Sequence, residues 1–253
     1  MARLLGIENI TRKFGGLEAL REVSFDVQAE EIVGVIGPNG AGKTTLFNVI
    51  TGVYPPTSGR IVLEENVLSN LKPHKIAQKG IIRTFQADVL FRELTVLQNV
   101  LVGLHMKSVG LRPKQMLFSS TLIPPAETDR ASDILETVGL TELREVLAGD
   151  LPHGHQRLLG IAVSLAAEPK VLLMDEPVTG MNLNEIKAVT DLVGRLNEKG
   201  MTILLVEHNI KTVMAICQRV VVLNFGKKIA EGSPEEIRRN KDVIEAYLGP
   251  ESA

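Results

Sequence analysis

The residues best placed to do chemistry lie in one glycine-rich stretch near the N-terminus. An apolar, β-branched run over residues 32–36 ends in Gly37, four residues follow, and then come Gly42, Lys43 and Thr44. This is the spacing of a phosphate-binding P-loop, and it stands between a predicted buried strand and a predicted helix. A glycine-rich turn that binds nothing would not need a lysine and a threonine at these offsets. The sequence therefore predicts a nucleotide site.

Each residue type in this stretch has a chemical role. Three glycines let backbone N–H groups approach phosphate oxygens, because a β-carbon would stand in the way. The positive end of the helix that follows points at the same anion. Lys43 would reach the β- and γ-phosphates, and the Thr44 hydroxyl would hold Mg²⁺. The predicted binding residues of the loop are Gly37, Pro38, Asn39, Gly40, Ala41, Gly42, Lys43, Thr44 and Thr45.

Two acidic residues follow a second predicted buried strand. The apolar run 171–174 leads directly into Asp175 and Glu176. In P-loop enzymes an aspartate at such a strand end completes the Mg²⁺ shell. An adjacent glutamate can take a proton from a water that attacks the γ-phosphate. The alternative is a pair of surface carboxylates, but with a P-loop present we favour Asp175 as a metal ligand and Glu176 as the catalytic base.

The elements around these motifs predict an α/β fold. Residues 4–27 are expected to form strands with short turns, and the alternation of apolar and polar positions over 23–27 indicates a half-buried strand in an N-terminal antiparallel β layer. The continuous apolar runs 171–174 and 203–206 are typical of core strands. The run 171–174 is typical of a parallel strand that is buried on both faces. A hairpin is predicted over 220–230, and one polar helix over 234–247.

Residues 87–168 differ in character from the rest, because the segments 94–104 and 130–138 show helical apolar spacing. We therefore expect a single domain over 1–253 with a P-loop NTPase (RecA-like) core. Residues 1–86 and 169–253 would form the β layer and the core. Residues 87–168 would form an inserted helical subdomain.

Composition limits the class of protein. The chain has 253 residues, 44% of them hydrophobic, which is enough for one large core with subdomains. The 28 basic and 30 acidic residues nearly balance, which argues against a nucleic-acid surface. Cys217 is the single cysteine, so we expect a reducing compartment. The start lacks an apolar stretch of signal-peptide length, and no run reaches the roughly 20 residues of a membrane span. We expect a soluble, cytoplasmic protein.

The order of motifs resembles that of ATP-binding-cassette (ABC) ATPases along essentially the whole chain. Residues 83–86 resemble the Q-loop of that family, and residues 151–156 stand where the family carries its signature motif. Residues 179–182 resemble its D-loop, and Glu207-His208 resembles its switch histidine. Together with the P-loop, these motifs occur in the order of the family.

Three further segments, 91–103, 231–237 and 243–249, resemble the subfamily for branched-chain amino-acid uptake. The resemblance implies an ATPase subunit that energises an importer of branched-chain or other hydrophobic amino acids. It also implies ATP and Mg²⁺ as ligands. The implied partners are transmembrane permease subunits, a second ATPase subunit and, indirectly, a solute-binding protein. The implied location is peripheral, on the inner face of the cell membrane.

The resemblance implies a head-to-tail dimer with two ATP molecules between the P-loop of one subunit and the signature of the other. Gln86 would then contact Mg²⁺ or the attacking water, His208 would hold the γ-phosphate, and Glu176 would be the base. Phe14 would stack on adenine, although an aromatic ring at this turn could instead pack on the β layer. The implied signature contacts are Leu151, His153 and Gly154.

The signature departs from the family pattern. Where relatives read Leu-Ser-Gly-Gly-Gln, this chain has Pro152, His153 and His155. A proline supplies neither a hydroxyl nor an N–H donor. Gly154 is retained, so the backbone can still approach phosphate. The effect of these changes on hydrolysis, and whether His153 contacts phosphate, stay open at this point.

Two other functions are compatible with a P-loop. The first is a soluble ABC-type ATPase that acts on a nucleic-acid or ribosomal partner. Such relatives carry long coiled-coil insertions or two cassettes, whereas this chain has one cassette and nearly balanced charge. The second is a GTPase, which would need Asn-Lys-x-Asp, but residues 240–242 lack the spacer. We expect no nucleic-acid partner. The sequence does not specify the solute or whether the dimer is homo- or heteromeric.

Overall fold

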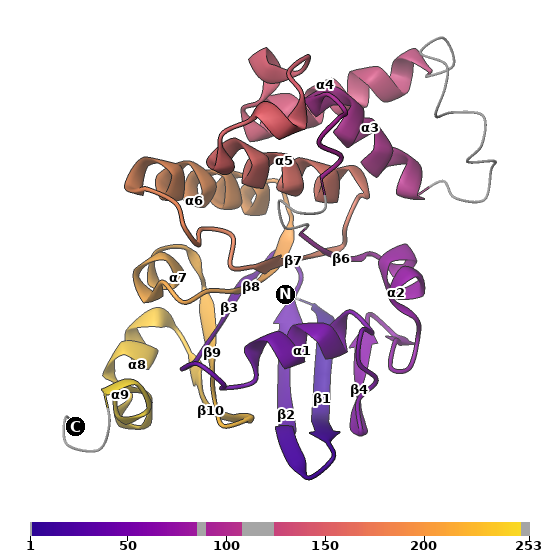
Figure 1. Cartoon of the computed structure of the whole chain (residues 1–253). Coiled ribbons are helices and arrows are strands. Elements are labelled where there is room, and N and C mark those ends of the chain that lie inside the picture. Colours follow the sequence, from indigo (N-terminus) through magenta and orange to yellow (C-terminus); the bar gives the residue numbers. More distant parts are fainter. Residues whose placement is uncertain (1, 85–89, 108–123, 249–253) are drawn as a thin grey trace. The chain divides into compact units, whose positions relative to one another are not determined.

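The computed structural model describes residues 2–84, 90–107 and 124–248. The chain divides into two compact units (Figure 1). The first unit combines residues 1–81 and 170–253, and the second contains residues 82–169. The first holds the predicted β layer and α/β core, and the second is helical, so the predicted fold class is confirmed.

The β layer of the first unit is an antiparallel sheet. Its order is β2-β1-β4-β5, with β1 (Arg3–Phe14), β2 (Leu17–Gln28), β4 (Ser58–Leu63) and β5 (Asn66–Val67). The alternation seen in the sequence has the expected consequence, because Val23, Phe25 and Val27 of β2 are buried while residues between them are not. The predicted pair of N-terminal strands is therefore confirmed.

The second sheet has the order β10-β9-β3-β8-β7-β6. Its strands are β3 (Ile32–Ile36), β6 (Ile81–Arg83), β7 (Val171–Asp175), β8 (Thr202–Val206), β9 (Arg219–Asn224) and β10 (Lys227–Gly232). Strands β9, β3, β8 and β7 run parallel, and β10 turns back against β9 as the predicted hairpin. Every residue of β3, β7 and β8 is buried, which explains their continuous apolar runs.

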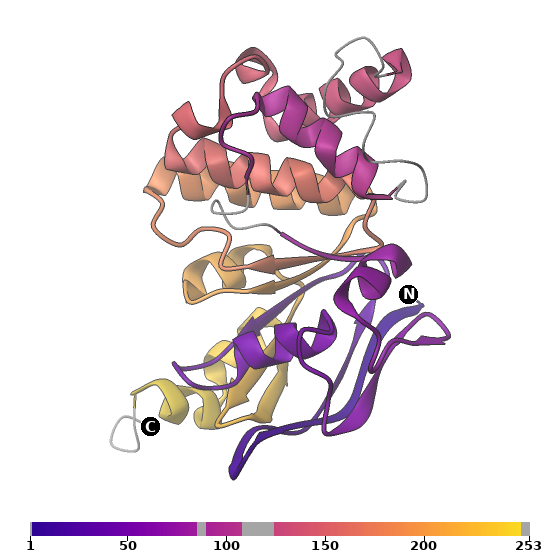
Figure 2. The same cartoon turned by 45° about the vertical axis from the view of Figure 1, so that its right-hand side comes forward.

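Among the described residues, the helices of the first unit are α1 (Lys43–Ile50), α2 (Pro73–Lys79), α6 (Leu183–Glu198), α7 (Ile210–Ile216), α8 (Pro234–Arg239) and α9 (Lys241–Leu248). The prediction of one helix over 234–247 was wrong. The chain forms α8 and α9 (yellow in Figure 2), separated by Asn240, whose backbone is extended. The Asn240 side chain accepts a hydrogen bond from the amide of Val243 at 3.2 Å. Asparagine favours such a cap over the helix interior, which accounts for the break.

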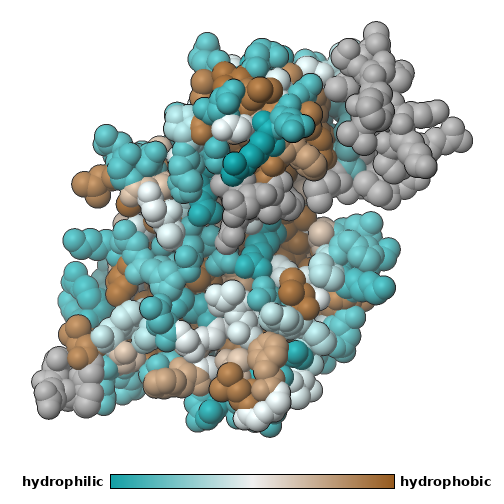
Figure 3. Space-filling view, viewed as in Figure 1, coloured by the Kyte–Doolittle hydropathy of each residue, from teal (hydrophilic) through white to brown (hydrophobic). Residues whose placement is uncertain are grey.

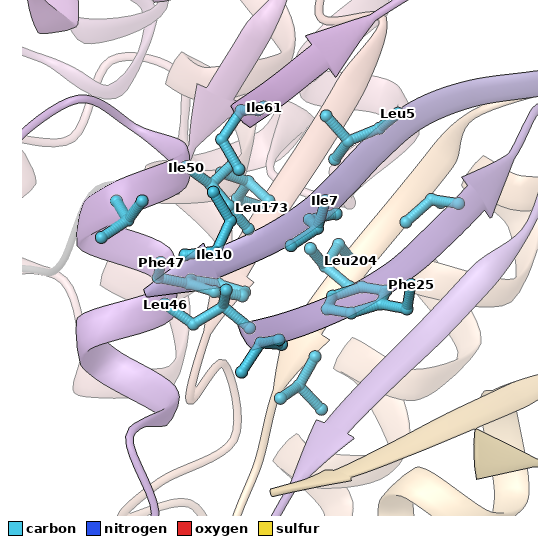
Figure 4. Close-up of a cluster of buried hydrophobic side chains, with 14 of the residues drawn as sticks. Leu5, Ile7, Ile10, Phe25, Leu46, Phe47, Ile50, Ile61, Leu173 and Leu204 are labelled. Carbon is cyan, nitrogen blue, oxygen red and sulfur yellow. The ribbon is translucent and has the colours of Figure 1, made fainter. Parts of the chain in front are cut away.

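The core of the first unit joins the β layer, α1 and the parallel sheet into one cluster (Figure 4). Apolar side chains from all three parts meet there, among them Leu5, Ile7, Ile10, Phe25, Leu46, Phe47, Ile50, Ile61, Leu173 and Leu204. Phe47 is fully buried, although it lies only four residues after Lys43. The helix that follows the P-loop is therefore anchored by the same core as the strands.

The second unit contains α3 (Val96–Lys107), α4 (Pro125–Val138) and α5 (His153–Ala166), with short 3-10 turns at Thr141–Leu143 and Ala148–Asp150. Gly103 lies where α3 packs on α5, because an added β-carbon would stand 2.7 Å from the carbonyl oxygen of Val163. Gly139 ends α4 with a φ of +78°, as its stop signal predicted. The polar stretch predicted to connect helices lies mostly outside the described residues.

On the face shown in Figure 3, hydrophilic and hydrophobic residues are interspersed. Among the helices within residues 2–84, 90–107 and 124–248, none has the length and apolar character that crossing a membrane requires.

Candidate nucleotide-binding site

The predicted site residues of the first unit follow neighbouring strands of one sheet. Because β3, β8 and β7 run parallel, their carboxyl ends lie at the same edge. The P-loop follows β3, Asp175 and Glu176 stand at the end of β7, and Glu207 with His208 follows β8. Strand order therefore gathers residues that are far apart in the sequence.

A hollow of about 430 Å³ opens over the P-loop. It is lined by Leu17, Glu18, Ala19, Arg21, Asn39, Gly40, Ala41, Gly42, Lys43, Thr44, Thr45, His208, Phe225 and Gly226. Most of the predicted loop residues line it, together with side chains of β2 and of the β9–β10 turn. A hollow of this size suits a small ligand, and its floor is the phosphate-binding motif.

Two glycines of the loop are required by close backbone approach. Gly37 has a φ of +155°, and a β-carbon there would lie 2.1 Å from the carbonyl oxygen of Leu223. Gly42 has a φ of +104°, and its β-carbon would lie 2.8 Å from the carbonyl oxygen of Ala19. The loop is also bound to the β9–β10 turn, because the amide of Gly226 donates to the Ala41 carbonyl at 3.0 Å.

The N-terminus of α1 faces this hollow with the polarity that an anion needs. The helix begins at Lys43, and its first turn has no acidic residue and no side-chain cap. Backbone N–H groups at the start of a helix carry a partial positive charge. A phosphate at this position would serve as the missing cap.

Lys43 is held across its own loop. Its Nζ atom donates to the carbonyl oxygen of Gly37 at 2.6 Å and to that of Pro38 at 3.0 Å. Burial lowers the pKa of the Lys43 ammonium, and the negative charge of Glu176 acts in the opposite direction. The ammonium is therefore a buried cation beside the loop, where phosphate oxygens would stabilise its charge.

The two acidic residues occupy different environments. Asp175 is the last residue of β7 and is buried. Glu176 is only partly buried, and its φ of +49° places it in the left-handed region that a non-glycine residue rarely adopts. Its amide donates to the carbonyl of Val206 at 2.9 Å, which fixes the turn against β8. Such backbone strain is often found at functional sites.

Glu176 and His208 are in direct contact. The Nε2 atom of His208 lies 2.5 Å from Oε1 of Glu176, and the Thr179 hydroxyl donates to Oε2 of Glu176 at 3.3 Å. The imidazole also lines the hollow. The structure therefore brings the predicted base and the predicted γ-phosphate contact together, although 31 residues separate them in the chain.

Phe14 lies outside the residues that line the hollow. Its ring packs against Tyr54 with centroids 5.1 Å apart, and the Arg12 guanidinium stands 4.4 Å from its centroid. Packing at the β layer, the alternative given for Phe14, is therefore present, and stacking on adenine stays a prediction. Gln86 lies outside the described residues, so its predicted roles stay predictions.

The signature residues belong to the second unit. Pro152 is the residue before α5 and provides no side-chain cap, while Leu151 and Gly154 are buried and His153 is exposed. The Gln156 side chain donates to the carbonyl of Leu151 at 2.9 Å, which holds the turn into the helix. The predicted contacts of Leu151, His153 and Gly154 with ATP stay predictions.

Sequence analysis missed several residues of the site. Leu17, Ala19 and Phe225 line the hollow, and Phe225 is 77% exposed at the tip of the β9–β10 hairpin. The available signal in the sequence was a phenylalanine in the predicted hairpin turn. Glu207 was noted only as the neighbour of His208, yet its side chain is almost fully buried.

A P-loop that opens a helix, with acidic residues at the end of another strand of the same parallel sheet, defines a P-loop nucleoside triphosphatase. Comparison with known protein families identifies the family within this class. The ABC transporter family model matches residues 20–179, and the model for the branched-chain amino acid ATP-binding cassette transporter matches residues 227–249. The chain therefore belongs to the ABC transporter family.

Individual relatives agree with this assignment. The high-affinity branched-chain amino acid transport ATP-binding protein LivG of Salmonella typhimurium is 46% identical over 254 residues, with 97% of this chain and 98% of the relative covered. The ADP conformation of MJ1267, an ATP-binding cassette of an ABC transporter, superposes with a TM-score of 0.87 at 34% identity, covering 98% of this chain and all of that one.

A third relative was solved as a dimer. The ATP-binding cassette MJ0796, in a post-hydrolysis state bound to ADP and Pi, has a TM-score of 0.76 and 26% identity, covering 91% of this chain and 99% of that one. These likenesses and the site agree. The chain is the ATP-binding and ATP-hydrolysing subunit of an ABC transporter.

Proposed function

We propose that this ATPase energises the uptake of branched-chain or other hydrophobic amino acids, with Glu176 as the catalytic base. The contact between Glu176 and His208 at the edge of the P-loop hollow carries the catalytic part of the proposal. The solute class is supported by the name of the LivG relative and by the family model that matches residues 227–249.

Mg²⁺ would be held by Thr44 and Asp175. A hydroxyl and a carboxylate are the oxygen donors that this ion prefers, and it usually takes its remaining ligands from water and from substrate phosphates. Within the described part of the chain, no three His, Cys, Asp or Glu side chains gather as a metal cluster. A site completed by nucleotide phosphates fits that donor set, and Gln86 remains a proposed further ligand.

ATP would be enclosed by a second ATPase subunit, either a copy of this chain or a related one. The dimeric relative bound to ADP and Pi supports this assembly. Leu183 is 85% exposed at the start of α6, next to the proposed D-loop, and so offers an apolar contact for a partner. Leu151, His153 and Gly154 would close on the ATP held by the opposite P-loop.

The permease subunits would dock on the second unit near Phe91. The Phe91 side chain is 55% exposed, while its backbone is held on both sides by buried Asn99. The Phe91 amide donates to Asn99 Oδ1 at 3.0 Å, and Asn99 Nδ2 donates to the Phe91 carbonyl at 3.0 Å. A fixed backbone that presents an exposed aromatic ring suits a docking contact. Docking there would place the protein on the inner face of the membrane, with a solute-binding protein as an indirect partner.

The first test is Glu176→Gln. We expect near-normal ATP affinity and hydrolysis that is about 10²–10⁴-fold slower, because the amide cannot take a proton from the attacking water. Equilibrium binding of ATP and steady-state phosphate release measure the two effects separately. If the Glu176→Gln variant, purified free of other ATPases, hydrolyses ATP as fast as the unchanged protein, Glu176 is not the catalytic base.

The second test is Phe91→Asp in transporters reconstituted with permease subunits. We expect basal ATP hydrolysis within a few-fold of normal and loss of amino-acid uptake, because an unpaired carboxylate is costly to desolvate in an apolar groove. Val67→Asp is the matched control, since Val67 is 53% exposed on β5 of the other unit. Full uptake by the Phe91 variant would place the docking surface elsewhere.

A further inference from the structure

Glu207 is a buried carboxylate that is not among the residues lining the hollow. It follows β8 directly, and only 1% of its surface is exposed. Its Oε1 atom accepts a hydrogen bond from the amide of Val178 at 2.9 Å. Its Oε2 atom accepts from the amides of His208 at 3.0 Å and Asn209 at 3.3 Å. All three donors are backbone groups.

These amides belong to the two loops that carry the proposed catalytic groups. Val178 stands two residues after Glu176, in the loop that leaves β7. His208 and Asn209 belong to the loop that leaves β8, and the Asn209 side chain then caps α7 by accepting from the amide of Thr212 at 3.2 Å. One carboxylate therefore connects the backbones of both loops, while Glu176 and His208 connect them through their side chains.

We propose that Glu207 is a positioning residue that sets the distance between Glu176 and His208. It holds the His208 backbone on one side and the Glu176 loop on the other, so that the imidazole reaches the carboxylate of the base. The proposal rests on the proposed roles of Glu176 and His208. Glu207 would act through them, because it is not among the residues that line the hollow.

The hydrogen-bond chemistry requires a carboxylate at this position. Ionised glutamate is an acceptor at both oxygens, which matches donors on two sides. Glutamine has the same shape, but its NH₂ group would face one set of amide donors and leave them without an acceptor. A buried donor that loses its partner is costly, so one loop should move away from the side chain. Displacement of about 1 Å near a reacting group can cost about 10²-fold in rate.

The experiment compares Glu207→Gln with the unchanged protein in three measurements: ATP affinity, kcat for hydrolysis, and stability to denaturant. We expect ATP affinity within about threefold, because the P-loop is untouched, and kcat reduced about 10–100-fold. Dividing the rate of turnover by the amount of bound ATP corrects for unfolded protein, because only folded molecules bind ATP.

Glu31→Gln is the matched control. Glu31 is also a buried carboxylate that accepts a hydrogen bond from a backbone amide, that of Gln28, but it lies away from the site. It should lower stability and leave kcat per bound ATP unchanged.

A double variant separates positioning from a general effect on the fold. In a His208→Ala background, Glu207→Gln should reduce kcat by less than about twofold, because the group that it positions is gone. A loss of the same size in both backgrounds would overturn the proposal, as would normal kcat in the single variant. If Glu176→Gln and His208→Ala each lower turnover strongly but measurably while Glu207→Gln leaves it unchanged, the inference about Glu207 fails and the proposed function stands.

A measurement on the unchanged protein does not depend on whether the variant folds. Hydrogen exchange at the Val178 amide should be slowed strongly relative to a free peptide, because that amide is buried against Glu207. Exchange at the free-peptide rate would show that the carboxylate does not hold the loop, and would contradict the proposal.

Discussion

Burial acts on the ionisation of single residues in the first unit. Cys217 packs against the backbone of β3, where a β-carbon at Gly34 would lie 2.9 Å from its sulfur. Burial raises the pKa of the Cys217 thiol to about 12, whereas burial lowers the pKa of the Lys43 ammonium. Both shifts disfavour the charged form, and for Lys43 the phosphate oxygens of a bound nucleotide would offset that effect.

Cys217 should be inert as a nucleophile in the folded protein. The thiolate is the reactive form, so we expect negligible reaction with a thiol reagent at about pH 8 in buffer and full reaction in denaturant. The pH dependence has a definite sign. Between the ordinary value of 9.0 and about 12, the unfolded chain loses the proton that the folded chain keeps, so stability falls as pH rises.

The Cys217 contribution to stability is fully present below about pH 9, and Cys217→Ala should remove this part of the alkaline loss. Denaturant titrations of both proteins at neutral and alkaline pH measure it. Rapid stoichiometric labelling of the folded protein would contradict the burial of the thiol.

At the scale of elements, α6 carries its start signal in its first residues. Asn182 precedes the helix, and its Oδ1 atom accepts from the amides of Asn184 at 3.0 Å and Glu185 at 3.1 Å. The Glu185 carboxylate accepts in return from the amide of Asn182 at 2.9 Å. This reciprocal capping box satisfies donors that the helix cannot pair by itself. It also ends the loop that begins at Glu176.

Asn182→Ala should lower the free energy of unfolding by about 1 kcal/mol, because the amides of the first turn lose their acceptor. Asn184→Ala is the matched control, since it lies two residues away and contributes only its backbone amide to the cap. Urea unfolding of each variant provides the comparison, because a shift of the midpoint at an unchanged m-value measures the change in stability. Equal losses in the two variants would show that the cap does not contribute.

At the scale of the whole molecule, Arg219 connects both sheets of the first unit. Its guanidinium donates to Glu31 at 2.8 and 2.7 Å in a two-pronged contact, and to the backbone carbonyl of Asp26 on β2 at 2.6 Å. It also pairs with Glu231 on β10. These carboxylates, Glu31 first, raise the pKa of Arg219. The β layer and the parallel sheet are thus joined by a charged contact as well as by the apolar core.

Arg219→Met should reduce stability by about 2–4 kcal/mol, because it leaves the buried Glu31 carboxylate without its cation. A second change, Glu31→Gln, should then cost less than it does alone, since the unpaired charge has been removed. Arg60→Met is the control. Its side chain is 61% exposed in a pair with Glu8, so we expect a change of at most about 0.5 kcal/mol. A loss for Arg219→Met no larger than for Arg60→Met would refute the contribution of the network.

Much of the site was determined by the sequence alone, because its chemistry is local. The P-loop follows from residue types at fixed offsets. Asp175 with Glu176, and Glu207 with His208, come after apolar runs that are buried along their whole length. Hydrophobic periodicity likewise identified the N-terminal strands of the β layer, and helical apolar spacing identified the helical character of the second unit. These features depend on neighbours within a few residues.

Only the tertiary structure decided which distant residues meet. β8 lies between β3 and β7, and this order brings His208 to Glu176 and places Glu207 between their loops. The same packing puts Phe225, rather than Phe14, against the hollow, and one asparagine splits the C-terminal helix. Strand order and side-chain burial depend on contacts between segments far apart in the chain, and residue spacing carries no record of those contacts.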